Sequence, residues 1–347
     1  MELLARQDSA TCYRHHTEGL VDVIVSSTPA TRQLLTDPHL VGSRYTHALR
    51  TGVRDALSLT TSVVPALEAA LTRTRAEILT ILRGGLTFDA PGAVEAVSGI
   101  PPAVSFIGTR RSGDGPVTVD YERWEDADGG VLVLGDIVAT GSTVELALRK
   151  VLDEVTAHRR RISHLVVVTI AAAPGLAAIE TLVNSYATAL PAPPSATIIA
   201  LESIFRLPEP GVDNGFPQAP FDFLRSTPAT APEFEWERLS HPDSLLEKCV
   251  VYDGGLRAFS PTGHLAFRRE WWTGFHPETS LESLTRVTAG LHHFALPFTE
   301  WREVAAPAVD RPDPDHDRIY EAGRRAWESL KGGTVGHYLD ERQVLQQ

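Results

Sequence analysis

The chain has 347 residues, and its 43% hydrophobic content supports a sizeable core in one large domain or two ordinary ones. Its formal net charge of −12 argues against a nucleic-acid or anionic-membrane surface, because phosphate groups attract an excess of Lys and Arg. The start of the chain is polar, and no apolar run approaches the about 18 residues of a membrane span, so we expect a soluble, cytoplasmic protein. The only cysteines, Cys12 and Cys249, lie far apart and indicate neither a disulfide framework nor a zinc site.

Residues 1–77 are predicted to form an N-terminal helical region that serves as packing structure. Apolar residues recur at three- and four-residue spacing from Thr46 to Leu59 and from Ser62 to Leu79, which is typical of two amphipathic helices. The adjacent His15 and His16 are interpreted as a surface pair, because neighbouring side chains on a helix or strand point in different directions.

Residues 78–206 are predicted to form an α/β core. Val131–Leu134 has no polar alternation, as expected of a central parallel strand that is covered on both faces, and a helix is predicted over Val144–Val151. The strands predicted in this core are Ile78–Leu82, Val104–Ile107, Val117–Trp124, Val131–Leu134, Ile162–Ile170 and Thr197–Ile204. Together these elements predict a twisted, mostly parallel sheet with helices on both faces.

The most informative stretch runs from Val131 to Thr143. A buried strand ends near Asp136 and is followed by a small, hydroxyl-rich turn that opens a helix. Such a turn aims unpaired backbone N–H groups and the positive end of the helix dipole at one spot, which favours phosphate. The Asp136 carboxylate can accept hydrogen bonds from sugar hydroxyls or hold a divalent cation. The predicted phosphate-binding residues are Ala139, Thr140, Gly141, Ser142 and Thr143. The alternative is an ordinary strand, turn and helix.

Two further loops combine glycine with arginine. The first core strand is followed by Arg83, Gly84 and Gly85. The glycines let an anion approach the main chain closely, and the guanidinium can bind two phosphate oxygens at once. The loop from Gly108 to Gly115 contains Arg110 and Arg111, and paired arginines on a mobile loop suit a lid that closes over an anionic group. Plain turns and solvated arginines are the alternatives.

A fourth segment, Ala173-Pro174-Gly175, follows the strand Ile162–Ile170. Ligands of open parallel sheets gather at the carboxyl ends of the strands, and all four loops are predicted to lie at such ends. This agreement between topology and motif predicts that the loops form one site, although a small-residue turn alone explains the last segment equally well.

Taken together, the four segments resemble the type I phosphoribosyltransferase family, and most of all its uracil phosphoribosyltransferase branch, over roughly residues 75–180. The resemblance implies 5-phosphoribosyl 1-pyrophosphate (PRPP) as a substrate, Mg²⁺ as a cofactor and a homodimer. It also implies a pyrophosphate loop at Arg83, Gly84 and Gly85 and a mobile lid over pyrophosphate that carries Arg110 and Arg111. Catalytic roles are implied for Asp136, Arg83, Arg110 and Arg111. Mg²⁺ is expected to enter with PRPP, with Asp136 as the candidate protein ligand, and no other protein-held metal is predicted.

Three departures from the family concern the acids and the acceptor. The family carries two consecutive acids, or Asp then Pro in the uracil branch, whereas this chain has Gly135 and then Asp136. Ala139 stands where purine-type members place an acid. The uracil-reading tail of the uracil branch is missing. The acceptor-side candidates are Ala173, Pro174, Gly175, Glu202, Asp213 and Asp222.

Residues 207–347 are predicted to form an irregular α+β extension that caps the acceptor side. A meander is predicted over Cys249–Phe259 and Gly263–Phe267, and a helix over Arg318–Leu330. Five of the six tryptophans lie here, and they are interpreted either as the core of the extension or as an aromatic wall over an acceptor.

The resulting hypothesis is a phosphoribosyltransferase that transfers the 5-phosphoribosyl group from PRPP to an aromatic or heteroaromatic acceptor other than uracil, with release of pyrophosphate. Two alternatives stay open: a non-catalytic PRPP-sensing regulatory protein, and a true uracil phosphoribosyltransferase that forms uridine monophosphate.

Overall fold

The computed structural model describes residues 1–111, 116–125, 130–157, 161–187, 190, 192–208, 229–247, 254–288, 290–304 and 313–342. The chain divides into two compact units. Unit 1 comprises residues 1–31 and 46–204, and unit 2 comprises residues 32–45 and 205–347. Within the described ranges, no helix combines the length and the apolar character that crossing a membrane requires.

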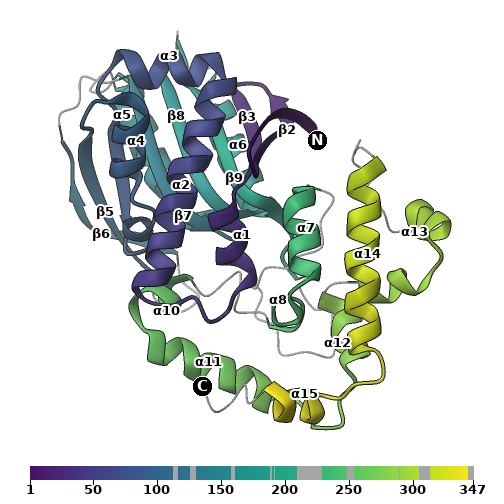
Figure 1. Ribbon diagram of the computed structural model, residues 1–347. Coiled ribbons are helices and arrows are strands. Elements are labelled where there is room, and N and C mark those ends of the chain that lie inside the picture. The colour runs from purple at the N-terminus through teal and green to yellow at the C-terminus, as the bar shows by residue number, and fades with distance from the viewer. Residues whose placement is uncertain are drawn as a thin grey trace. The chain divides into compact units, whose positions relative to one another are not determined.

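Unit 1 is built on a nine-stranded sheet with the order β1-β2-β3-β9-β8-β7-β4-β5-β6 (Figure 1). The pairs β3–β9, β7–β8, β4–β7 and β4–β5 are parallel, and β1–β2, β2–β3 and β5–β6 are antiparallel. The strands are β1 (Glu2–Gln7), β2 (Ala10–Glu18), β3 (Val21–Ser27), β4 (Glu77–Leu82), β5 (Ala103–Arg111), β6 (Val117–Arg123), β7 (Val131–Val138), β8 (His164–Ala172) and β9 (Ser195–Phe205). The predicted fold class, a mostly parallel sheet within an α/β protein, is confirmed.

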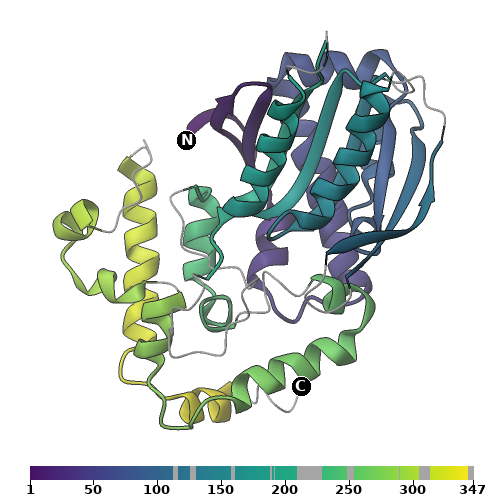
Figure 2. The same cartoon turned by 180° about the vertical axis from the view of Figure 1, so that it is seen from behind.

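Helices cover both faces of this sheet. Helix α2 (Ser43–Val63) lies in front of the sheet in Figure 1, whereas α5 (Ser142–Thr156) and α6 (Ala173–Ser185) lie in front of it in Figure 2. The other helices that belong to unit 1 are α3 (Pro65–Arg73), the 3₁₀ helix η1 (Gly84–Thr87) and α4 (Ala90–Ser98). Every residue of β8 is buried, as its mostly apolar sequence predicts for a central strand with helices on both sides.

The predicted helical region over residues 1–77 is helical in its middle, in α2 and α3, but not at its two ends. Residues 2–27 form β1, β2 and β3, and the second predicted helix ends at Arg73, before β4 begins at Glu77. Strand β1 is the edge strand of the sheet and β2 is its neighbour, and both expose many side chains, so neither shows an apolar run that would mark it as a strand. The division of the chain at residues 77 and 206 stays a prediction.

The described part of unit 2 is mainly helical. It contains α7 (Pro232–Leu239), α8 (Pro242–Leu246), α10 (Gly254–Phe259), α11 (Pro261–Thr273), α12 (Leu281–Thr288), the 3₁₀ helix η2 (Leu291–Ala295), α13 (Phe298–Val304), α14 (Asp313–Leu330) and α15 (Val335–Arg342). The short helix α1 (Pro29–Thr36) begins in unit 1 and ends in unit 2. The predicted helix over Arg318–Leu330 is confirmed as the greater part of α14.

The predicted meander over Cys249–Phe259 and Gly263–Phe267 is wrong where the structure describes it. Residues 254–259 and 261–273 are helical, and residues 249–253 lie outside the described part of the chain. Pro261 suits the first turn of α11, where its missing N–H is not needed. The buried residues His264, Arg268 and Trp271 then follow at helical spacing.

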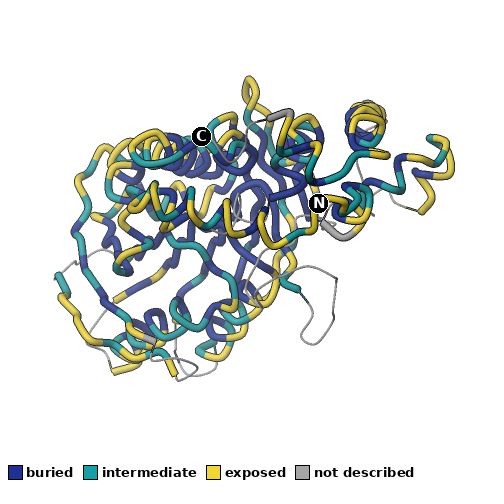
Figure 3. The backbone as a smooth tube through the Cα atoms, turned by 90° about the horizontal axis from the view of Figure 1, so that it is seen from below, coloured by how far each residue is buried: buried dark blue, intermediate teal, exposed yellow. Residues whose placement is uncertain are grey.

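The tryptophans of unit 2 contribute to its hydrophobic core, which is one of their two predicted roles. Trp271, Trp272 and Trp301 are buried, and the partly buried Trp236 and Trp327 pack against the same cluster. Figure 3 colours the backbone by the burial of each residue, with buried residues in dark blue and exposed residues in yellow. The extension therefore has an apolar core of its own.

Candidate functional site

The site predicted from the sequence lies at the point where the strand order of the sheet reverses. Strand β4 is paired with β5 on one side and with β7 on the other, and all three run parallel. The loops that follow β4 and β7 therefore leave the same edge of the sheet in opposite directions. In doubly wound sheets this edge opens a crevice where ligands bind.

Gly84 and Asp136 bring the loop after β4 into contact with the end of β7. A β-carbon placed on Gly84 would collide with Oδ1 of Asp136, so glycine is needed for this approach. The backbone N–H of Ile137 donates a hydrogen bond of 2.8 Å to the same oxygen. Burial raises the pKa of Asp136 to about 7, and the Ile137 hydrogen bond only partly opposes this shift. The neighbouring Arg83 is exposed, and the Leu82–Arg83 peptide bond is cis.

Phe88 explains why the chain carries glycine where the family carries its first acid. A β-carbon on Gly135 would come within 2.6 Å of the Phe88 β-carbon and within 2.8 Å of its Cγ. Phe88 is fully buried just after η1. An acidic side chain at position 135 would thus meet a packed aromatic residue, which leaves Asp136 as the single carboxylate of the motif.

The predicted phosphate loop begins helix α5. Gly141 precedes the helix with φ of 84°, a left-handed conformation that favours glycine, and Ser142 is the first helical residue. The hydroxyls of Thr140 and Ser142 are 3.0 Å apart and hydrogen-bonded. The first backbone N–H groups of a helix have no partner within it, so this turn offers the donors and the dipole that an anion requires.

The Ala173-Pro174-Gly175 segment lies against that loop. A β-carbon on Gly175 would approach the carbonyl oxygen of Ala139 to 2.7 Å, and one on Gly141 would come within 3.1 Å of the carbonyl oxygen of Gly175. Pro174 belongs to the first turn of α6. The structure thus brings three of the four predicted loops together at the carboxyl ends of β4, β7 and β8.

The fourth predicted loop joins the antiparallel strands β5 and β6. Arg110 lies on β5, and its Nη2 donates a hydrogen bond of 3.2 Å to Oδ2 of Asp120 on β6. The ion pair is exposed to solvent, so breaking it costs at most about 1 kcal/mol. Arg111 ends β5, and residues 112–115 at the tip lie outside the described part of the chain.

Of the other acceptor-side candidates, Glu202 is fully buried within unit 1. Its carboxylate accepts a 3.0 Å hydrogen bond from the backbone N–H of Thr28 and another from the Thr31 hydroxyl. The Glu202 carboxylate thus has structural partners, and its contact with an acceptor stays a prediction. Asp213 and Asp222 lie outside the described residues.

Thr169 is a polar neighbour of the site that sequence reasoning missed. It is the register partner of Asp136 on the adjacent parallel strand β8, so the two side chains share one face of the sheet. Its hydroxyl is buried, and it has no hydrogen-bond partner among the described residues. A single threonine in an apolar strand signals nothing by itself, and only the strand register brings it beside Asp136.

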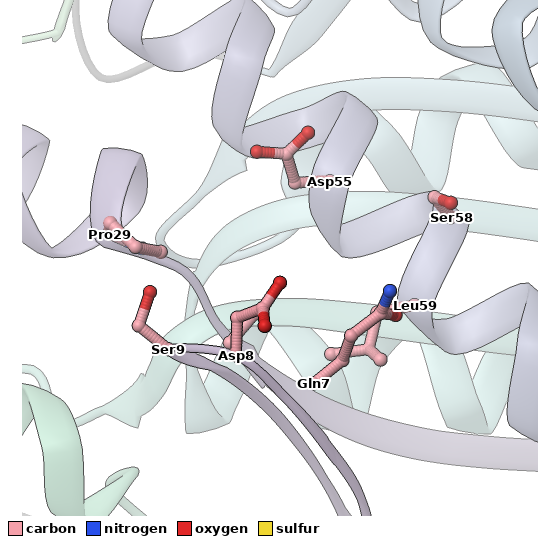
Figure 4. A pocket seen from close by; sticks show the side chains of 8 residues that line it. Gln7, Asp8, Ser9, Pro29, Asp55, Ser58 and Leu59 are labelled. Atoms are coloured by element: carbon pink, nitrogen blue, oxygen red, sulfur yellow. The ribbon is translucent and has the colours of Figure 1, made fainter.

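The structure also contains a cavity of about 330 Å³ at another place in unit 1 (Figure 4). It lies between the turn that joins β1 to β2, the start of α1 and the middle of α2. The residues that line it are Gln7, Asp8, Ser9, Ala10, Pro29, Asp55, Ser58 and Leu59. None of the predicted site residues lines this cavity, so it is separate from the loops described above.

The strand order and the converging loops define a doubly wound α/β protein in which three of the predicted loops meet at one edge of the sheet. No family model matches the chain. A curated relative, the uracil phosphoribosyltransferase of Natronomonas pharaonis, is 32% identical over 142 residues, which cover 39% of this chain and 57% of the relative. The match therefore spans a little over half the length of that relative.

Two solved structures show a more distant likeness. Hypoxanthine-guanine phosphoribosyl transferase of L. donovani is 16% identical, with a TM-score of 0.30, and the match covers 48% of this chain and 83% of that one. A mutant hypoxanthine phosphoribosyltransferase of Trypanosoma cruzi, complexed with IMP, is 19% identical, with a TM-score of 0.27. That match covers 36% of this chain and 63% of the solved one.

The match to the curated relative and the strand order agree with the resemblance found in the sequence. The predicted resemblance to the type I phosphoribosyltransferase family is confirmed.

Proposed function

We propose that the protein transfers the 5-phosphoribosyl group from PRPP to an aromatic or heteroaromatic acceptor and releases pyrophosphate. The observation that carries this proposal is the close approach of Gly84 to the Asp136 carboxylate beside the turn that begins α5. A ribose that carries phosphate groups at both ends needs this combination of a carboxylate for its hydroxyls and backbone donors for its phosphates.

In the proposed reaction the bond between ribose C1 and the pyrophosphate oxygen breaks, and its electron pair leaves with pyrophosphate. A new bond forms between C1 and the acceptor, and the proton that the acceptor loses passes to the released pyrophosphate or to water. Ala139 has no side-chain base to take that proton. Because the expected transition state resembles an oxocarbenium ion, the residues of the site act by positioning the reactants and by balancing charge.

The proposed roles follow from the position of each loop. Residues 139–143 would hold the 5-phosphate with backbone N–H groups, and Asp136 would accept hydrogen bonds from the ribose hydroxyls. Arg83, with Gly84 and Gly85, would bind pyrophosphate from the loop after β4. Arg110 and Arg111 would approach pyrophosphate from the β5–β6 hairpin, once Arg110 exchanges its exposed partner Asp120.

Mg²⁺ fits the donor set of this site. The Asp136 carboxylate offers the oxygen ligand that Mg²⁺ prefers. Mg²⁺ would supply charge neutralisation for the departing pyrophosphate. A homodimer and a cytoplasmic location also stay predictions, and light scattering of the purified protein tests the first of them.

The proposed acceptor is not uracil. The uracil-reading tail of the uracil branch is absent, and a helical unit with its own apolar core occupies the C-terminal part of the chain instead. A site that reads a ring by hydrogen bonds loses about 1–3 kcal/mol for each buried group left unpaired, so changing that region changes specificity. The name of the curated relative favours the alternative, which is a uracil phosphoribosyltransferase.

Incubation of the full chain with PRPP, Mg²⁺ and a panel of aromatic acceptors that includes uracil tests the proposal, with pyrophosphate release as the readout. We expect release with at least one acceptor and none above background with uracil. Rapid formation of uridine monophosphate would refute the proposed acceptor class and leave the PRPP site intact. Stabilisation by PRPP without turnover of any acceptor would instead favour the PRPP-sensing alternative.

A further inference from the structure

Unit 1 contains a group of three side chains that could hold a metal ion, and the proposed transfer reaction does not use them. His16 and Glu18 belong to β2, and Glu180 belongs to α6. One ligand atom from each of the three residues lies within 4.8 Å of the other two. His16 Nε2 and Glu180 Oε1 are already 3.0 Å apart.

A β-bulge in β2 directs two of these side chains to one face of the sheet. Arg14 pairs with Ile24 of β3, whereas His16 pairs with Val23, so the register shifts by one residue at His15. Since adjacent residues of a strand point to opposite faces, this shift places His16 on the face opposite to Arg14. Glu18 lies two residues further along and shares the face of His16.

Helix α6 is held on that same face by a separate contact. Asn184, one turn after Glu180, accepts a 3.0 Å hydrogen bond from the backbone N–H of Leu20 through its Oδ1. A β-carbon on Gly19 would collide with the Asn184 side chain, so the β2–β3 turn lies directly against the helix. The position of Glu180 relative to His16 and Glu18 is thus fixed by the packing of two elements.

We propose that His16, Glu18 and Glu180 bind a divalent transition metal ion of the Zn²⁺ type and thereby join β2 to α6. One imidazole nitrogen and two carboxylate oxygens are ligands that Zn²⁺ accepts, and water completes a tetrahedral set. Mg²⁺ prefers oxygen ligands and near-octahedral geometry, so this site selects a different ion from the Mg²⁺ expected with PRPP.

The proposed ion stabilises unit 1 at a position that also supports the PRPP site. Helix α6 begins at Ala173, and Gly175 in its first turn lies against the phosphate loop. An ion that ties the middle of α6 to β2 restrains the same helix whose first turn packs on that loop. The role assigned to it is structural, and it takes no part in group transfer.

The test uses the full chain, freed of metal by a chelator, with ZnCl₂ as the titrant in calorimetry and in thermal unfolding. We expect saturable binding of one Zn²⁺ per chain, together with a rise in Tm. His16→Gln and Glu18→Gln each weaken that binding at least about tenfold and remove the rise in Tm. His15→Gln is the matched control, because it removes the neighbouring imidazole and leaves the three proposed ligands in place.

Two results would overturn the proposal. One is the absence of saturable Zn²⁺ binding to the wild type. The other is binding to His16→Gln and Glu18→Gln with wild-type affinity, which would assign the ion to other residues. Glu18 is exposed, so Glu18→Gln keeps the test decisive if the His16 variant does not fold. Addition of MgCl₂ at the same concentration as ZnCl₂ should not displace the bound Zn²⁺.

Discussion

Gly84 and Asp136 approach each other so closely that a single added methyl group on Gly84 would occupy the space of the Asp136 Oδ1 atom. Asp136 lies on β7 and Gly84 begins η1, just after β4, so they meet because β4 and β7 are neighbours at the reversal of the strand order. The contact therefore links the sheet topology to the position of the one carboxylate in the motif.

Gly84→Ala should displace the Asp136 carboxylate without unfolding the protein. The atom in the way is the end of a side chain, which can turn aside, so we expect a change in stability of less than about 1 kcal/mol. PRPP affinity should fall about tenfold or more, which corresponds to about 1.4 kcal/mol. Calorimetric titration with PRPP and Mg²⁺ measures the loss. Gly255→Ala, at a position with open space, is the control and should bind PRPP like the wild type.

Asp136→Asn keeps the shape of the side chain and removes its charge. If Asp136 contacts ribose or Mg²⁺, turnover should fall at least tenfold, or about 1.4 kcal/mol of transition-state stabilisation. Steady-state pyrophosphate release with a productive acceptor measures this effect. Wild-type kinetics in the variant would show that the carboxylate has only a structural role.

Asp136→Asn should increase the stability of the ligand-free protein at neutral pH, although it lowers turnover. The pKa of Asp136 is raised from 3.8 to about 7 in the folded state, so the folded state holds its proton more tightly than the unfolded state does. That contribution to stability is fully present below pH 3.8 and is lost as the pH rises through 7. The wild type should therefore lose stability relative to Asp136→Asn between pH 5 and pH 8, by more than about 1 kcal/mol. Urea unfolding at both pH values checks this, and parallel pH profiles would contradict it.

Much of the proposed PRPP site could be described from the sequence because its signals are local. An apolar strand, a glycine and a hydroxyl-rich turn are consecutive in the chain, so Asp136 and residues 139–143 are found by reading one stretch. The partners of that stretch are not local. Phe88 and Thr169 reach it through strand order and register, which single-sequence patterns do not encode.

The two regions that were predicted wrongly lack a clear period in the sequence. Strands β1 and β2 expose many of their side chains, so their apolar residues are too sparse to show alternation. In α11 the residues that face the core include His264 and Arg268, whose polarity hides the helical period. Both are buried because they have partners elsewhere in unit 2, such as Glu247 for Arg268.

Gly135→Asp, which would restore the consecutive acids of the family, should destabilise this protein. The new side chain would be forced against buried Phe88, and overpacking of this kind costs about 1–3 kcal/mol. A double-mutant cycle with Phe88→Ala isolates the clash. The penalty of Gly135→Asp, measured by denaturant unfolding, should shrink in the Phe88→Ala background. An equal penalty in both backgrounds would mean that Phe88 is not what excludes the second acid.

The last prediction concerns the buried ion pair of unit 2. Arg268 donates two hydrogen bonds of 2.7 Å to the two carboxylate oxygens of Glu247, and Trp272 Nε1 donates a third of 2.9 Å. Glu247 is fully buried, so Arg268→Ala would remove two charge-assisted hydrogen bonds from a carboxylate in the core of the unit. Removal of one partner from such a pair costs about 3–5 kcal/mol.

Arg269→Ala provides the matched control, because Arg269 is the next residue on α11 and is exposed. We expect a loss of unfolding free energy near 3–5 kcal/mol for Arg268→Ala and less than about 0.5 kcal/mol for Arg269→Ala, both measured at pH 7 in urea. A further substitution, Glu247→Gln in the Arg268→Ala background, should recover part of the loss, because the neutral amide costs less to bury than the carboxylate. If Arg268→Ala is as stable as Arg269→Ala, the pair does not hold α11 in the core of unit 2.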